Sequence, residues 1–180
     1  MVPRIGSRHR IFSASINDSF QRVLHDYEHF FCSDLLPEVA AGTEVEERVF
    51  CQNLERLTFP DESFDVVITE DVFEHVKYPE RAFGEVHRVL SNAGIHIFTV
   101  PFVFDRPTIV RVDAETDRFL LPPEYHGDSL RGKILAYRTF GIDMFEYLEK
   151  TGFQTSVVFS RLKDLRFGIV DSYVFISRKR

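Results

Sequence analysis

The clearest hydrophobic pattern in the chain lies between residues 64 and 100, where two apolar segments flank an amphipathic one. Residues 64–69 form a short β-branched run, which is typical of a strand buried on both faces of a parallel sheet. In residues 79–90 apolar side chains recur at helical spacing, and Pro79 suits a first helical turn. Residues 95–100 are again rich in β-formers. The pattern therefore predicts a strand–helix–strand unit with a right-handed crossover.

Weaker patterns before this unit extend the same α/β architecture. A helical face begins at Asn17, and strands are expected at residues 28–33 and 46–51. Residues 1–6 are the candidate for a first strand, but Pro3 cannot donate a hydrogen bond to a neighbouring strand. We therefore expect the first strand to be short or missing.

The pattern after this unit predicts the end of the sheet. A helix is expected to begin at Asp143 with an Asp-x-x-Glu capping box and to end at Gly152. Apolar runs at residues 153–159 and 173–177 predict two further strands. Because only a loop joins them, they should form an antiparallel pair at one edge of the sheet.

Residues 102–140, the cap segment, show no clear periodicity and contain several Pro and Gly residues. A connection of this length inside a small domain is commonly a functional lid or disordered. Its aromatic and aliphatic content favours an ordered, partly helical cap on the substrate side of a single domain spanning residues 1–180.

Candidate chemistry gathers where the strand at residues 64–69 ends. In open α/β sheets the ligand crevice lies beyond the carboxyl ends of the strands. Glu70, Asp71, Glu74 and His75 place three carboxylates and an imidazole at that point. The alternative is a solvated acidic loop. A metal site formed by His75, Glu74 and His126 is conceivable, but these residues do not have a ligand spacing such as His-x-x-x-His, so no metal site is expected.

Composition limits the classes of protein that fit. A formal charge of −6 and a pI near 5.6 argue against a nucleic-acid-binding protein. Two cysteines, Cys32 and Cys51, do not make a disulfide framework, which favours reduced thiols and a cytoplasmic location. No apolar run approaches the roughly 20 residues of a membrane span, so no membrane association is expected.

Three segments resemble the class I S-adenosylmethionine-dependent methyltransferases. They are residues 53–65, which contain the Leu-Thr-Phe-Pro … Phe-Asp signature, then Glu74-His75-Val76, then residues 79–90. The similarity is closest to the small-molecule branch of the family. It implies a Rossmann-like, mostly parallel sheet with an antiparallel C-terminal edge strand. It also implies S-adenosylmethionine as cofactor and methyl transfer to a small-molecule or glycan-linked acceptor.

The resemblance also implies roles for individual residues. Asp34, followed by Leu35, matches the acidic position that receives the ribose hydroxyls, since a carboxylate accepts two such bonds. Asn53 would face the adenine amino group, and Leu54 would pack on the ring. Thr69, Glu70 and Asp71 would lie beside the methionine moiety, and His75 and Glu70 are the candidate catalytic groups. Tyr125 and His126 could provide a base on the acceptor side, with a surface turn as the alternative.

The chain departs from the family at the glycine-rich cofactor loop. The candidate loop holds Gly6 and Ser7 between arginines, where the family has an acidic residue and three glycines that let the backbone approach the cofactor. Three explanations stay open: a truncated chain, a degenerate homologue without cofactor binding that serves as a partner or scaffold subunit, or a variant loop that still turns at these two residues. A missing central strand would favour a homodimer.

Overall fold

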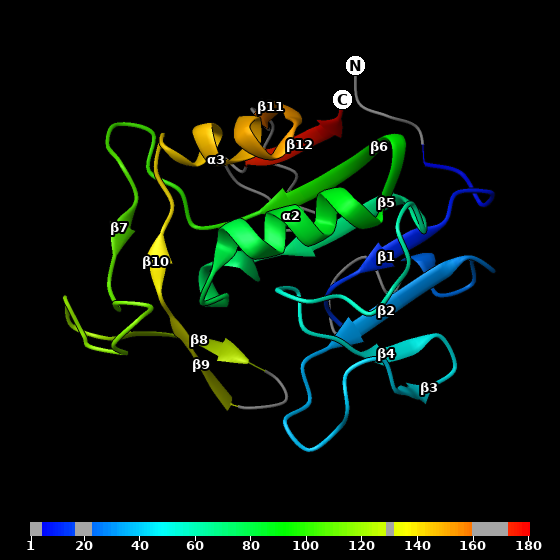
Figure 1. Ribbon diagram of the computed structural model, residues 1–180, viewed down its shortest axis with the longest axis horizontal. Helices are drawn as coiled ribbons and strands as arrows, with labels where there is room; N and C mark the ends of the chain where they lie inside the picture. The colour runs from blue at the N-terminus through cyan, green and yellow to red at the C-terminus, as the bar shows by residue number, and fades with distance from the viewer. Residues whose placement is uncertain (1–4, 17–22, 129–131, 160–172) are drawn as a thin grey trace.

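The computed structural model describes residues 5–16, 23–128, 132–159 and 173–180. An eight-stranded sheet with the order β11-β12-β6-β5-β1-β2-β4-β3 forms its centre (Figure 1). The strands are β1 (Ile11–Ser13), β2 (Phe30–Asp34), β3 (Glu44–Glu46), β4 (Val49–Cys51), β5 (Phe64–Glu70), β6 (Leu90–Thr99), β11 (Phe153–Phe159) and β12 (Tyr173–Lys179).

The middle of the sheet is parallel and its two ends are antiparallel. Strands β6, β5, β1, β2 and β4 run in one direction. The C-terminal strand β12 is antiparallel to both β6 and β11, and β3 is antiparallel to β4. This arrangement confirms the predicted Rossmann-like class. The antiparallel C-terminal strand lies one place in from the edge, which β11 occupies.

The first strand is short, as expected, but it consists of different residues. It is Ile11–Ser13, which lies between β2 and β5, whereas residues 1–4 of the predicted strand lie outside the described part of the chain. Both Ile11 and Phe12 are fully buried, and they belong to separate apolar clusters on opposite faces of the sheet. Three residues suffice because neighbouring strands hydrogen-bond them on both sides and apolar side chains cover both faces.

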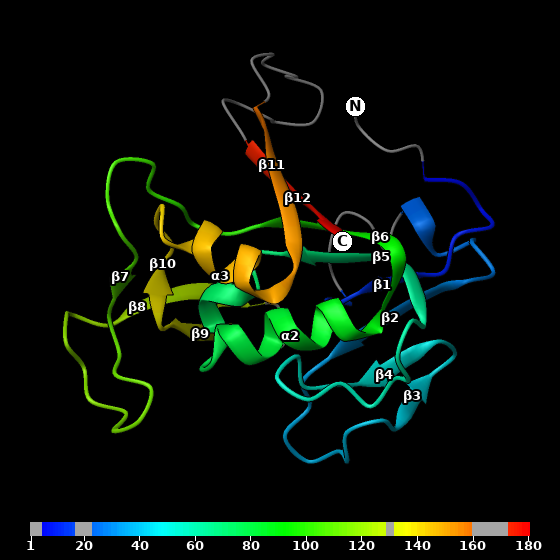
Figure 2. The same ribbon diagram turned by 45° about the horizontal axis from the view of Figure 1, so that its top comes forward.

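Two α-helices cover one face of the sheet (Figures 1 and 2). Helix α2 (Pro79–Val89) begins with Pro79 at its first turn, as predicted, and passes directly into β6 at Leu90. Helix α3 (Met144–Thr151) ends at Gly152, whose φ of 99° is the left-handed conformation that glycine adopts without strain. The two helices pack against each other and bury phenylalanines of the central strands.

The predicted capping box at Asp143 is wrong in its hydrogen bonding. Asp143 occupies the cap position of α3, but its side chain makes no capping bond. Its Oδ1 instead accepts hydrogen bonds from the backbone amide of Thr108 at 2.8 Å and from the Thr108 hydroxyl at 2.7 Å. The carboxylate thus connects the start of α3 to the cap segment, because a long-range partner takes the bonds that local capping would use.

The cap segment is extended rather than partly helical. It forms two small antiparallel sheets and no helix in its described residues, which corrects the expectation. The strands are β7 (Ile109–Val110), β8 (Glu124–Asp128), β9 (Gly132–Ala136) and β10 (Arg138–Thr139). A short 3-10 helix, η1 (Phe73–His75), contacts both β9 and β10. Pairing with η1 and between the strands satisfies backbone groups that a helix would have satisfied internally.

Two expected elements lie mainly outside the described residues. The helix predicted from Asn17 falls largely on residues 17–22, although Val23 and Leu24 are helical and Leu24 is buried. The loop between the final strands falls on residues 160–172. Within the described parts of the chain, neither helix has the length and apolarity that crossing a bilayer requires.

Candidate functional site

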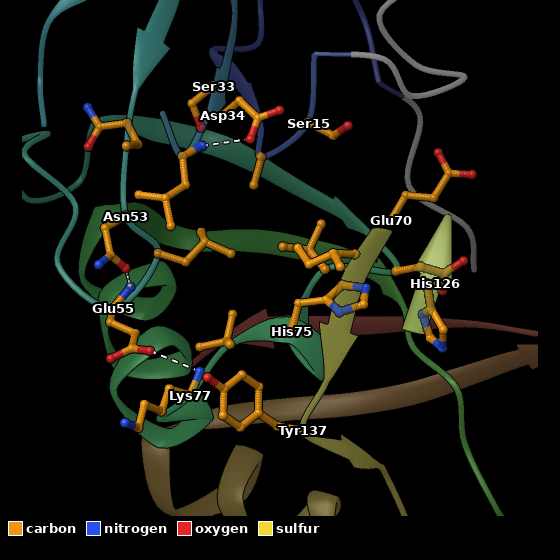
Figure 3. A pocket seen from close by; sticks show the side chains of 18 of the residues that line it. Ser15, Ser33, Asp34, Asn53, Glu55, Glu70, His75, Lys77, His126 and Tyr137 are labelled. Atoms are coloured by element: carbon orange, nitrogen blue, oxygen red, sulfur yellow. Dashed lines mark hydrogen bonds between the residues drawn. The ribbon is translucent and has the colours of Figure 1, made fainter. Parts of the chain in front are cut away.

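One cavity opens at the carboxyl ends of the parallel strands, and we call it the strand-end cavity (Figure 3). Its volume of about 710 Å³ falls within the range of roughly 300–1,000 Å³ that is usual for small-molecule sites. Residues following β1, β2, β4 and β5 form one side, and η1 with the β8–β9 hairpin of the cap segment forms the other. The central sheet therefore places the cavity where a doubly wound fold binds its ligand.

Most of the residues predicted from the sequence are brought together at this cavity. These residues lie far apart in the chain, but they follow β2, β4 and β5, whose carboxyl ends lie on the same side of the sheet. The predicted residues that line the cavity are Asp34, Leu35, Asn53, Leu54, Glu70, Asp71, His75 and His126. Their common position supports the predicted convergence, while their individual roles stay predictions.

Gly6 and Ser7 are not part of the cavity, which corrects the position assigned to the cofactor loop. Both residues precede β1 and therefore lie at the opposite edge of the sheet from the strand ends. Arg10 also stays away from the cavity, because its guanidinium and its amide donate to the Asp65 carboxylate at the start of β5, at 2.8 and 2.9 Å. The error follows from placing the first strand too early in the chain.

Thr69 and Tyr125 also lie outside the cavity lining. Thr69 is buried in the sheet, and its Oγ1 lies 2.9 Å from Nε2 of His96. Tyr125 is exposed on β8, whereas the next residue, His126, faces the cavity. The difference follows from strand geometry, because successive side chains point to opposite faces.

Several lining residues were not predicted from the sequence. Ala14 and Ser15 follow β1 and occupy the position expected for the cofactor loop. In the sequence they are preceded by two apolar residues, Ile11 and Phe12, and a further small one, Ser13. This pattern is too short to show the alternation that identifies a strand. The other lining residues that were missed are Ser33, Gln52, Glu55, Val72, Val76, Lys77, Gly127, Ile134 and Tyr137.

Hydrogen bonds hold the loop after β4 against the start of α2. Asn53 Oδ1 accepts from the backbone amide of Glu55 at 2.8 Å. Glu55 Oε1 in turn accepts from the backbone amides of Lys77 and Tyr78, at 3.0 and 3.1 Å. On the other wall Asp34 Oδ1 accepts from the amide of Leu35 at 2.7 Å. The side chains that line this half of the cavity are therefore positioned by the backbone around them (Figure 3).

Carboxylates predominate among the charged side chains that line the cavity. Asp34, Glu55, Glu70 and Asp71 contribute carboxylates, and Lys77 is the cation among the described lining residues apart from the two histidines. The Lys77 ammonium lies 2.7 Å from Asp117, a residue outside the cavity lining. An excess of carboxylates around a partly enclosed space favours a cationic ligand.

Behind the cavity wall, Glu74 and two histidines form a cluster. Glu74 is fully buried, and none of the described residues donates a hydrogen bond to its carboxylate. Burial, with the nearby charges of Asp71 and Glu124, raises the pKa of Glu74 to about 8. Glu74 Oε1 lies 3.7 Å from His75 Nε2 and 3.4 Å from His126 Nδ1. The fold thus brings together the three residues that the sequence offered as a conceivable metal site, although their spacing in the chain gave no reason to expect one.

Comparison with known proteins identifies the domain. Residues 16–98 match the family model described as a methyltransferase domain. An uncharacterized protein of Methanocaldococcus jannaschii is 40% identical over 82 residues, which are 46% of this chain and 36% of that protein. The chain therefore matches about a third of the length of this relative.

Solved structures with low sequence identity share the fold. An S-adenosylmethionine-dependent methyltransferase from Mesorhizobium loti has a TM-score of 0.62 at 18% identity, over 99% of this chain and 94% of that one. A Burkholderia thailandensis 1,6-didemethyltoxoflavin-N1-methyltransferase with bound 1,6-didemethyltoxoflavin and S-adenosylhomocysteine has a TM-score of 0.56 at 14% identity, over 95% and 71% of the two chains. Residues 16–98 thus match a methyltransferase domain, and the chain shares its fold with these S-adenosylmethionine-dependent methyltransferases.

Proposed function

We propose that the strand-end cavity binds S-adenosylmethionine and that the protein transfers its methyl group to a small-molecule acceptor. The observation that carries this proposal is the convergence of Asp34, Asn53 and Glu70, from the ends of three separate strands, on one acidic cavity. A sulfonium cofactor with an amino group carries positive charge, which matches the carboxylates of the lining.

The residues present fit such a cofactor. The Asp34 carboxylate would accept hydrogen bonds from the ribose hydroxyls, while Asn53 and Leu54 would contact the adenine. Glu70 and Asp71, at the end of β5, would face the positively charged methionine portion. Ala14 and Ser15 take the place of a glycine-rich loop, since small side chains after β1 leave the backbone close to the cavity.

The acceptor would bind between the sheet and the cap segment. His75, His126 and Tyr137 lie on the side of the cavity away from Asp34 (Figure 3), and Ile134 also lines the cavity. When bound, the cofactor supplies an electrophilic methyl group on its sulfonium. The protein's contribution is to orient the acceptor in line with that group and to exclude water, for which a hairpin covering the strand ends is suited.

Calorimetry with S-adenosylmethionine and S-adenosylhomocysteine tests cofactor binding. We expect micromolar affinity, weakened at least tenfold by Asp34→Ala because the ribose hydroxyls lose their acceptor. Glu38→Ala is the matched control, since Glu38 is an exposed carboxylate four residues further along that does not line the cavity. The control should bind like the unaltered protein.

Turnover is measured as S-adenosylhomocysteine released in the presence of the low-molecular-mass fraction of a cell extract. Release that depends on the extract and falls in Asp34→Ala supports a small-molecule acceptor. The absence of both heat and thermal shift at millimolar cofactor would contradict the proposal. That outcome would instead favour a domain that serves as a partner or scaffold subunit.

A further inference from the structure

Glu74, His75 and His126 each direct one potential ligand atom toward a common point. These atoms all lie within 4.8 Å of one another. Two of the separations, from Glu74 Oε1, are 3.7 Å to His75 Nε2 and 3.4 Å to His126 Nδ1. Both exceed a good hydrogen bond. They are close to the roughly 3.3–3.5 Å that separates two ligands at about 2.0–2.1 Å from a tetrahedral zinc ion.

We propose that Glu74, His75 and His126 bind a divalent transition-metal ion, with zinc favoured by the two-imidazole, one-carboxylate donor set, at the wall of the strand-end cavity. This inference goes beyond the proposed function and does not depend on it. A metal ion could bind whether or not the protein transfers a methyl group.

The hydrogen bonds of both histidines orient the ring nitrogen that faces Glu74. His75 Nδ1 lies 2.8 Å from the carbonyl oxygen of Leu135, which can only accept, so Nδ1 carries the proton and Nε2 carries the lone pair. His126 Nε2 lies 3.3 Å from Glu124 Oε1, which directs the Nδ1 lone pair toward Glu74. Partners of this kind on the far nitrogen are the usual support of metal-binding histidines.

Glu74 supplies an independent reason to expect a cation. A buried carboxylate without a hydrogen-bond donor is costly, and no described residue donates to either of its oxygens. Asp71 and Glu124 add further negative charge nearby. A bound dication would offset this negative charge and stabilise the ionised form of Glu74.

The position of the cluster leaves room for a further ligand of the metal. His75 and His126 line the cavity, while Glu74 lies behind them. An ion held by the three side chains would therefore have an open coordination position facing the cavity. Three protein ligands with one open position are the arrangement of catalytic rather than structural zinc sites.

Zinc competition between the protein and a chromophoric chelator tests the proposal, with chelator-treated protein and no cofactor. We expect one equivalent to bind, with affinity reduced at least tenfold in Glu74→Gln and in His126→Ala. Glu124→Gln should reduce affinity by about 10- to 100-fold through loss of the outer support. His25→Ala is the matched control, because His25 is exposed and lies outside the cluster.

Thermal melting separates metal binding from folding. Without metal, Glu74→Gln should melt at or above the temperature of the unaltered protein, because the amide cannot ionise in this buried position. Zinc should raise the melting temperature of the unaltered protein and leave that of Glu74→Gln unchanged. The cobalt-substituted protein should lack a thiolate charge-transfer band, which excludes Cys32 and Cys51 as the ligands.

Equal zinc affinity in Glu74→Gln, His126→Ala and the His25→Ala control would overturn the proposal. Failure of the unaltered protein to bind zinc would do the same. Because no cofactor is present, either result would leave the proposed methyl transfer unaffected. Conversely, zinc binding without cofactor binding would support the metal site alone.

Discussion

Thr69 Oγ1 lies 2.9 Å from His96 Nε2 in the interior of the sheet, between the neighbouring strands β5 and β6. The imidazole is fully buried and stacks on Phe98 with ring centroids 4.4 Å apart. Burial lowers the pKa of His96 to about 3. This histidine is therefore a structural, neutral group, and its hydrogen bond explains why Thr69 does not reach the cavity.

We predict that His96 makes the protein sensitive to moderate acid. Between pH 6.5 and about 3 the unfolded chain binds a proton at this residue that the folded chain does not. The free energy of unfolding should therefore decrease as the pH is lowered, by up to about 1.4 kcal/mol per pH unit in that window. The double variant Thr69→Val/His96→Phe should show a flatter dependence in urea titrations across that window. An unchanged slope would contradict the assignment.

The Arg10–Asp65 pair should act at lower pH. Hydrogen bonds from Arg10 lower the pKa of Asp65 to about 2, so its contribution is present above the ordinary carboxyl pKa and is lost as pH falls toward 2. Asp65→Asn should cost about 1–2 kcal/mol at neutral pH and remove that acid-dependent loss. Urea denaturation between pH 2 and 7 measures both effects.

The same pair also tests the corrected position of the first strand. Because Arg10 and Asp65 lie at the edge opposite the cavity, Arg10→Gln should leave the affinity for S-adenosylmethionine within about twofold of the unaltered value, well under 1 kcal/mol. A large loss or gain of affinity in calorimetry would mean that the arginine segment does reach the ligand.

Elements with long hydrophobic patterns could be predicted from the sequence, whereas elements with short patterns could not. Residues 64–100 contain enough alternating and helical positions to define β5, α2 and β6, and the final pair β11–β12 was predicted for the same reason. The first strand is three residues long, so it has no measurable period, and the error moved the cofactor loop to Gly6 and Ser7. Its two-sided burial depends on strands that come later in the chain.

The part of the candidate site that lies at the strand ends could be predicted from the sequence. Glu70 could be found because it ends the apolar run at residues 64–69, whereas Asp34 and Asn53 were found by their match to positions of the methyltransferase family. The cluster of Glu74, His75 and His126 was only a conceivable metal site in the sequence, since its assembly depends on how the cap segment folds back over η1. The pairing of β8 with β9 decides that His126 faces the cavity while Tyr125 does not.

Gly141 should be intolerant of any side chain. An added Cβ would lie 2.3 Å from the carbonyl oxygen of Arg106 and 2.5 Å from the amide nitrogen of Thr108, and both are backbone atoms that cannot rotate away. We expect Gly141→Ala to cost about 1–3 kcal/mol. Gly84→Ala is the control: it lies within α2 with open space around it, and should gain up to about 1 kcal/mol. Paired urea denaturation curves measure the difference, and equal effects would contradict the prediction.

Arg138 should determine how firmly the cap segment is attached to the sheet domain. Its buried guanidinium donates to the carbonyl oxygens of Val76 and Lys77, just before α2, the latter at 2.8 Å. Arg138→Met keeps most of the side-chain length but leaves both carbonyls without this donor, so we expect a loss of about 1–3 kcal/mol.

Arg138→Lys is the matched control, because an ammonium keeps the charge but cannot make the planar pair of bonds, and its loss should be smaller than that of Arg138→Met. Hydrogen exchange supplies the specific readout. Amides of β8 and β9 should exchange faster in Arg138→Met, while those of β5 and β6 change only as far as global stability does. The two acceptors of Arg138 lie where the cap segment meets the start of α2, which is why the effect should be local to the cap segment. Equal acceleration of both sets of amides would mean that Arg138 supports the whole domain instead.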